Sequence, residues 1–214
     1  MRIIISLILF LIVFASCNDN ITNPYINGDI IPLAEGNQWI YEVTKYDSTG
    51  KNVVSTRLDT MLIGVKDSSG LYHVKGIFGS SPLVYLSNSK NGLKYSTLTV
   101  IPQIDSNGKP IDKFGLIEKL LFKYPQISKG LVYNVDELNA IKVENVNTRV
   151  KTSIGNFRCC VYKYYTIKGG LNFSTKIYTY LSPGVGIIKY EIFDESNIKK
   201  ILKESYILKH TNVI

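Results

Sequence analysis

The sequence repeatedly alternates apolar and polar residues over short runs. In "NVVSTRLDTML", Val54, Leu58 and Leu62 share one side of an extended chain, whereas Arg57 and Asp59 share the other. The same two-residue period recurs in "LYHVKGIF" and "FSTKIYTYL". This period is typical of strands with one face on a core and the other in water. We therefore expect Val54, Leu58 and Leu62 to face the core.

Turn signals separate these runs at short intervals, in "DSTGK", "KDSSG", "NSKNG", "DSNGK" and "KGGLN". Each contains a glycine, which adopts positive φ at a bend without steric cost. Short strands joined by tight turns form a meander, and about ten of them would curl into a barrel, a half-barrel or a sandwich. The sequence predicts an all-β fold, an antiparallel meander curled into a half-barrel or incomplete barrel.

The segment 112–124 is the one exception to this pattern. Asp112 is a candidate helix N-cap, the apolar residues follow a helical spacing from Phe114 to Tyr124, and Pro125 would stop a helix. We expect one short helix here. A strand is the alternative, because Phe122 and Tyr124 also alternate with polar neighbours.

The glycine-rich stretch "SPGVGIIKYE" raises the question of a phosphate-binding loop. Such a loop opens a helix, but the residues after Gly186 form a β-rich run. Pro183 and Gly184 instead suit the two central positions of a type II turn. We expect a corner between two strands, where Gly186 allows a close backbone approach or a bulge.

The N-terminus carries a secretory signal. Arg2 precedes an apolar run, Ile3 to Ala15, that is shorter than the roughly 20 residues of a membrane-spanning helix. The sequence before Cys17 resembles the lipobox of bacterial lipoproteins, in which the cysteine is lipidated and becomes the first mature residue. We expect a signal peptide at 1–16, the lipidated Cys17 with a flexible tether at 17–29, and a single β domain at 30–214. An ordinary signal peptide with an incidental Cys17 is the alternative.

The charge balance is basic but does not indicate nucleic-acid binding. The formal net charge is +8, and loss of Arg2 with the signal peptide leaves 24 basic and 17 acidic residues, or +7. A chain anchored outside the cytoplasm does not meet nucleic acid, and its lysines are dispersed. The expected partners are membrane lipid at Cys17 and either a hydrophobic small molecule or an envelope protein.

Catalytic and metal-binding signatures are missing from the sequence, so we predict a non-enzyme with no cofactor and no metal site. The two histidines, His73 and His210, are too few for a metal cluster and are not placed for a triad. Glu42 and Asp59 could pair across strands as glycosidase carboxylates, although exposed acids are usually solubilising. The adjacent thiols Cys159 and Cys160, whose role the sequence leaves open, point to opposite faces of a strand. We expect them to be small apolar side chains in the core and not to form a disulfide with each other.

Aromatic residues supply the candidate binding surface. Trp39 and Tyr41 share one strand face, and they either anchor the core or line a ligand wall. A second aromatic group comprises Tyr162, Tyr164, Tyr178 and Tyr180, on two neighbouring strands. We expect these four side chains to share one face. They would form a ligand wall if that face is concave, and packing or an exposed platform if it is convex.

Three motifs together resemble a family of mostly uncharacterised bacterial cell-envelope lipoproteins. "IPLAEGNQWIYEV" resembles its P-L-x-x-G-N-x-W-x-Y strand, "VKTSIGNFRCCVYKY" its T-x-x-G-x-F hairpin, and "SPGVGIIKYE" its P-G-V-G-x-x-K turn. The resemblance implies a curved antiparallel sheet or incomplete barrel with an apolar concavity. It implies no catalytic residues.

The leading hypothesis is therefore a non-catalytic, membrane-anchored envelope lipoprotein whose curved sheet binds a hydrophobic ligand or a partner protein. A structural or assembly subunit of a surface complex is the alternative, followed by a carboxylate-dependent hydrolase of envelope polymers. We expect the bacterial cell envelope as location, with a lipid anchor in the outer membrane. The sequence does not determine which side of that membrane carries the protein.

Overall fold

The computed structural model describes residues 29–76, 84–167, 175–195 and 199–213. Within these ranges all the regular structure is β, and the antiparallel all-β expectation is confirmed. The strands are β1 (Gln38–Tyr46), β2 (Val53–Lys66), β3 (Tyr72–Lys75), β4 (Val84–Ser89), β5 (Gly92–Ile104), β6 (Pro110–Lys123), β7 (Val132–Asn134), β8 (Asn139–Thr152), β9 (Gly155–Thr166), β10 (Thr175–Ser182), β11 (Gly186–Glu195) and β12 (Lys200–Thr211). Cys17 and the expected signal peptide lie outside the described residues.

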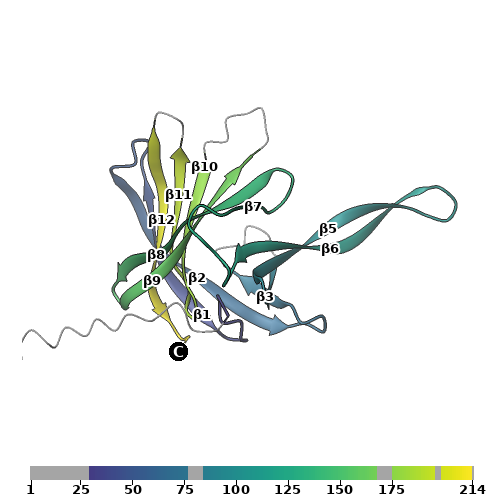
Figure 1. Ribbon diagram of the computed structural model, residues 1–214, viewed down its shortest axis with the longest axis horizontal. Helices are drawn as coiled ribbons and strands as arrows, with labels where there is room; N and C mark the ends of the chain where they lie inside the picture. Colours follow the sequence, from purple (N-terminus) through teal and green to yellow (C-terminus); the bar gives the residue numbers. More distant parts are fainter. Residues whose placement is uncertain (1–28, 77–83, 168–174, 196–198, 214) are drawn as a thin grey trace, which may run out of the picture.

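All twelve strands belong to one sheet, which consists of two successive meanders. Its order is β6-β5-β4-β3-β2-β1-β12-β11-β10-β9-β8-β7, so β1 and β12 join the two meanders in the middle. The consecutive strands β6 and β7 form the two outer edges and are not paired with each other. The sheet is curled but not closed by a hydrogen-bonded ladder (Figure 1), as the half-barrel expectation requires.

The expectation of a helix over 112–124 is wrong, because residues 112–123 belong to strand β6. It pairs with β5 from Pro110 to Lys123. Phe114 and Ile117 are 68% and 40% exposed whereas Tyr124 is buried, so the helically spaced apolar residues do not share one buried face. The ladder with β5 provides backbone partners along the whole segment, and this tertiary pairing outweighs the local helical spacing.

The core-facing side of β2 is also the opposite of the expected one. Val54 and Leu58 are 67% and 68% exposed, whereas Met61 and Ile63 are buried. The register with β1 places Met61 opposite Trp39. Because side chains alternate between faces, this register directs Met61 and Ile63, and not Leu58 or Leu62, to the core.

The centre of the core lies on the inner face of β1. Trp39, Tyr41 and Val43 are completely buried there. The indole Nε1 of Trp39 donates to the carbonyl of Val185 at 2.7 Å, and the hydroxyl of Tyr41 donates to the carbonyl of Ile187 at 3.0 Å. Val185 directly precedes β11 and Ile187 is its second residue, so both acceptors lie beyond β12 from β1. These two bonds therefore span the concave side of the sheet and satisfy the polar atoms of two buried aromatic residues.

The corner before β11 has the geometry predicted from its sequence. The Val185 N–H donates to the Ser182 carbonyl at 3.0 Å, and Gly184 has φ of +78°, as in a type II turn. Gly186 has φ of +105°, and a Cβ atom at this position would lie 3.0 Å from Trp39 Nε1. Gly186 is therefore required both by its backbone conformation and by the indole packed against it.

We expect Gly186→Ala to lower the free energy of unfolding by about 3 kcal/mol, from positive-φ strain and from displacement of the indole. Gly184→Ala is the matched control: its φ is also positive, but open space surrounds the missing Cβ. It should cost about 1 kcal/mol. Urea unfolding followed by Trp39 fluorescence measures both variants, and equal losses would contradict the role given to the Trp39 contact.

Candidate functional site

The inner face of the sheet contains an apolar cavity of about 140 Å³, called the inner cavity below. Four of its lining residues are buried and form the floor, and four are half-buried and form the rim. The floor comprises Phe122, Ile141, Tyr162 and Thr179, and the rim comprises Leu121, Tyr164, Ile177 and Tyr190.

The strand registers explain how most of the lining converges. On β9 and β10, Tyr162 lies opposite Thr179 and Tyr164 lies opposite Ile177. Tyr190 of β11 in turn lies opposite Thr179. Directly opposed residues of antiparallel strands share a face and lie close together. Neighbouring strands of the second meander therefore form a continuous inner wall.

The remaining part of the wall comes from the end of β6, in the first meander. The Tyr162 hydroxyl donates to the Lys123 carbonyl at 2.7 Å. The Tyr133 hydroxyl accepts from the Lys123 N–H at 3.0 Å and donates to the Leu121 carbonyl at 3.1 Å. These bonds hold Leu121 and Phe122 over the cavity, where the Phe122 and Tyr162 ring centroids are 5.0 Å apart. Two tyrosine hydroxyls thus join the ends of the sheet where no ladder does.

The wall of the inner cavity is uncharged at neutral pH. Burial raises the pKa of Tyr162 well above its ordinary value. Burial, with a smaller contribution from Asp136, raises the pKa of Tyr164 to about 12. The pKa of Tyr190 is raised mainly by burial as well. A neutral, mostly apolar wall favours an apolar ligand and provides no ionised group for acid–base chemistry.

The six aromatic candidates occupy three different places. Trp39 and Tyr41 lie in the core, and Tyr162 and Tyr164 line the inner cavity. The expectation that the four tyrosines share one face is wrong, because Tyr178 lies opposite Lys163 and Tyr180 opposite Val161. The register pairs even-numbered residues of β10 with odd-numbered residues of β9. Tyrosines with even numbers on both strands therefore project to opposite sides of the sheet.

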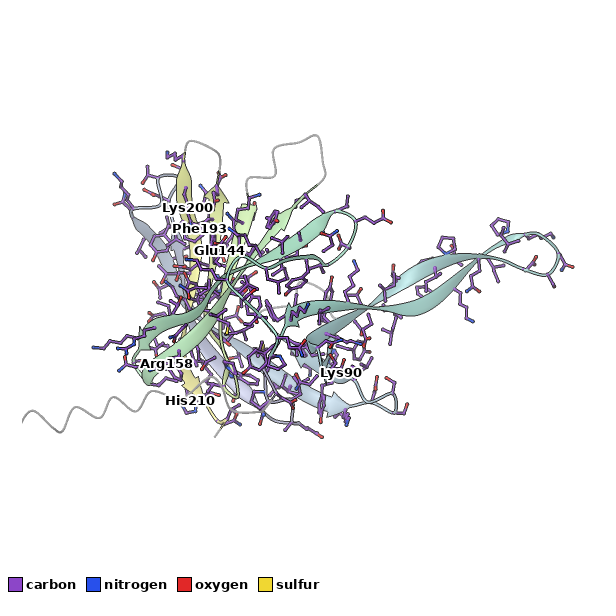
Figure 2. The ribbon with its side chains drawn as sticks, viewed as in Figure 1. Lys90, Glu144, Arg158, Phe193, Lys200 and His210 are labelled. Atoms are coloured by element: carbon purple, nitrogen blue, oxygen red, sulfur yellow. The ribbon has the colours of Figure 1, made fainter. Side chains whose placement is uncertain are left out.

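Tyr178 and Tyr180 belong to a polar network on the outer face. The Tyr178 hydroxyl donates to Glu195 at 3.0 Å, and the Tyr180 hydroxyl donates to Glu191 at 2.9 Å. The Lys200 ammonium lies 3.9 Å from the Tyr178 ring centroid and 4.1 Å from that of Phe193. Lys200 and Phe193 lie together at the ends of β12 and β11 (Figure 2). The Lys200 ammonium therefore occupies the faces of the Tyr178 and Phe193 rings.

The expected carboxylate pair does not form. The register places Asp59 opposite Tyr41 and Glu42 opposite Leu58, so Glu42 and Asp59 project from opposite faces of the sheet. Glu42 pairs with Lys209 at 3.2 Å. Two carboxylates on opposite faces cannot flank one glycosidic bond, so this pair is not a glycosidase site.

The cysteines and histidines do not gather into a reactive site. Cys159 and Cys160 are free and buried, and burial raises the pKa of Cys160 to about 11 and that of Cys159 further. Buried thiols of this kind are poor nucleophiles. His73 lies on β3 and His210 on β12, with β2 and β1 between them. The described residues contain no cluster of three metal-ligating side chains.

Sequence reasoning missed most of the cavity lining. Phe122 had a signal only in the strand alternative for 112–124, in which Phe122 and Tyr124 alternate with other residues. Ile141, Thr179 and Tyr190 had no individual signal, because residues of this kind occur throughout the chain. Tyr133 was missed because only a three-dimensional structure places its hydroxyl beside Lys123.

The described part of the chain contains no helix long and apolar enough to span a bilayer. No family model and no curated protein matches this sequence. Similar solved structures include a candidate lipoprotein from Parabacteroides distasonis, at 15% identity and a TM-score of 0.42. They also include a candidate exported protein with a YmcC-like fold from Bacteroides fragilis, at 14% identity and a TM-score of 0.41. Each similarity covers 86% of this chain and 99% of the other.

We expect Tyr162→Phe to lower the free energy of unfolding by about 1–3 kcal/mol, because the Lys123 carbonyl loses a buried hydrogen bond. Tyr164→Phe is the matched control, since the Tyr164 hydroxyl makes no hydrogen bond among the described residues. Its effect should stay within about 0.5 kcal/mol. Denaturant unfolding measures both variants, and a Tyr162→Phe variant as stable as the control would contradict the joining role of this hydroxyl.

Proposed function

We propose that this chain is a non-catalytic lipoprotein of the bacterial cell envelope, anchored in the outer membrane through Cys17, whose inner cavity binds the apolar part of a small ligand. The observation that carries the ligand assignment is the cavity itself, a neutral pocket with a buried floor and an accessible rim. Anchoring rests on the signal sequence and on the residues before Cys17.

The volume of the inner cavity restricts the ligand. At about 140 Å³ it is smaller than the roughly 300–1,000 Å³ of drug-sized sites. It is close to the roughly 150 Å³ apolar cavity that binds benzene in an engineered lysozyme. We therefore assign it one aromatic ring or the terminal part of one acyl chain, with the rest of an amphiphile remaining outside the rim.

Charged groups lie near this rim. The Lys119 ammonium pairs with the Asp136 carboxylate at 2.8 Å, between β6 and the turn after β7. The Asp136 carboxylate contributes to the raised pKa of Tyr164, a rim residue. Its charge therefore acts at the rim. An amphiphilic ligand would thus meet an apolar floor and a charged exterior, an arrangement that orients it with its apolar end inward.

A second candidate function is that of an assembly subunit that docks a partner protein. The observation in its favour is a concentration of exposed apolar side chains on the outer part of β5 and β6. Ligand binding and docking use different parts of the molecule and are compatible.

Lipidation can be tested with Cys17→Ala. We expect the wild-type protein to enter the detergent phase in Triton X-114 partitioning and to carry the mass of its acyl groups, because two or more chains anchor it stably. The Cys17→Ala variant should lack the added acyl mass, whereas Cys160→Ala should carry it like the wild type. A wild-type protein cleaved without added lipid mass would support an ordinary signal peptide and contradict the anchor.

Ligand binding can be tested by NMR titration with benzene and with hexanoate. Both probes should shift the methyl signals of Ile141 and Ile177, which line the cavity. Ile177→Phe should abolish the shift at Ile141, because the added ring enters the mouth of the cavity. Thr175→Phe adds the same ring at an exposed position on the same face of β10 and should leave binding unchanged. Saturating probe without any shift at Ile141 would contradict the proposed ligand site.

A further inference from the structure

The outer parts of β5 and β6 form a two-stranded ribbon that projects from the sheet, defined here as residues 98–117 and called the arm. β4 pairs with β5 only as far as Thr97, and β6 is the last strand of the sheet. Among the described residues, therefore, no third strand pairs with the arm. Figure 1 shows the ribbon extending well away from the rest of the sheet.

The arm carries exposed apolar side chains on both of its faces. The register pairs Leu98 with Leu116 and Val100 with Phe114 on one face, and Ile104 projects to the same side. The opposite face carries Ile101, Ile111 and Ile117. These eight residues are half of the sixteen exposed large apolar residues in the described chain, and Phe114 and Ile104 are 68% and 76% exposed. Figure 2 shows side chains on both sides of the ribbon with no other element beside its outer half.

Such a ribbon is not expected to function uncovered. A two-stranded hairpin alone is marginally stable in water. Contiguous exposed apolar surface marks an interaction site, and unpaired strand edges add backbone donors and acceptors that seek partners. Both long edges of the arm are unpaired in the described chain.

The distribution of residues indicates what covers the arm. Its tip is polar, and Asp105 accepts hydrogen bonds from the N–H groups of Asn107 and Lys109 within the turn. Insertion of this tip into a bilayer would bury a carboxylate, and a flat membrane surface would cover one face only. The arm of a second copy, stacked face to face, would likewise leave the other apolar face in water. A cleft in another protein can cover both faces and add a strand to a free edge.

We propose that the arm inserts into an apolar cleft of a partner protein in the cell envelope, which covers both faces of the ribbon and extends β5 or β6 by strand addition. This interaction is independent of the inner cavity and of any ligand bound there. The Leu98–Leu116 face and the Ile101–Ile117 face contact the same partner. Phe114, the single aromatic residue of the arm and 68% exposed, is its principal anchor.

Photo-crosslinking in the envelope of the producing organism tests the proposal. The full-length protein carries benzoylphenylalanine at Phe114 on one face or at Ile111 on the other. The control position is Leu58, which is as exposed as Phe114 and more exposed than Ile111 but lies on β2. We expect Phe114 and Ile111 to crosslink to one and the same protein and Leu58 to crosslink to none. This protein, once purified, should bind Phe114→Asp at least about 30-fold more weakly than wild type, and Leu58→Asp normally.

Four results would overturn the proposal: adducts with a second copy of this chain, adducts with lipid only, different proteins at the two arm positions, or no adduct at all. Equal binding of Phe114→Asp and wild type by the purified partner would also overturn it. Urea unfolding followed by Trp39 fluorescence distinguishes lost docking from misfolding, since the arm lies outside the core that surrounds Trp39. The arm and the inner cavity share no residue, so benzene binding is expected even if the docking proposal fails.

Discussion

The hydrogen bond from the Tyr162 hydroxyl to the Lys123 carbonyl joins the two ends of a sheet that its own ladder leaves open. A buried phenol requires a partner for its hydroxyl, and this requirement holds the end of β6 against β9. Tyr133 adds two bonds to the same stretch of backbone. Without these contacts Leu121 and Phe122 would not be held against β9, and the inner cavity would lose this part of its lining.

The same device stabilises the opposite side of the core. Trp39 and Tyr41 reach across the concave face and donate to carbonyls at the start of β11. Gly186 makes this approach possible, because a side chain there would collide with the indole. The curl of the sheet thus depends on a few aromatic side chains, each with one polar atom directed at the backbone of a strand that is not its neighbour.

The sequence was sufficient to predict the all-β class, the corner at Ser182–Val185 and the turns that lead into β2, β3, β5 and β6, because these features depend on local period and on glycine and proline geometry. The turn expected in "KGGLN" lies outside the described residues. It was not sufficient to assign faces. A two-residue period shows which residues of one strand share a side, but the register with the next strand decides which side is inner. β2 was therefore placed with Leu58 inward, and Tyr162 and Tyr178 were placed together. Irregular registers such as that between Tyr180 and Leu181 cannot be read from composition.

β6 shows the same limit at the level of secondary structure. The apolar residues from Phe114 to Tyr124 fit a helical period by coincidence, and only the long ladder with β5 resolves the segment as a strand. The candidate site depended on this segment. The cavity was therefore predictable only in small part: Tyr162 and Tyr164 were identified as a possible wall, whereas the β6 residues of its lining were assigned to a helix.

The molecule consists of a curled body, stabilised by its aromatic core, and an arm that pairs with no third strand of the described chain. Amide hydrogen exchange, measured by mass spectrometry on purified protein and on native membranes, tests this division most directly. We predict that peptides from 98–117 exchange rapidly in the purified protein and slowly in native membranes, while peptides from 139–166 exchange slowly in both. Slow exchange of the arm in the purified protein, or equal exchange of the arm in both samples, would contradict it.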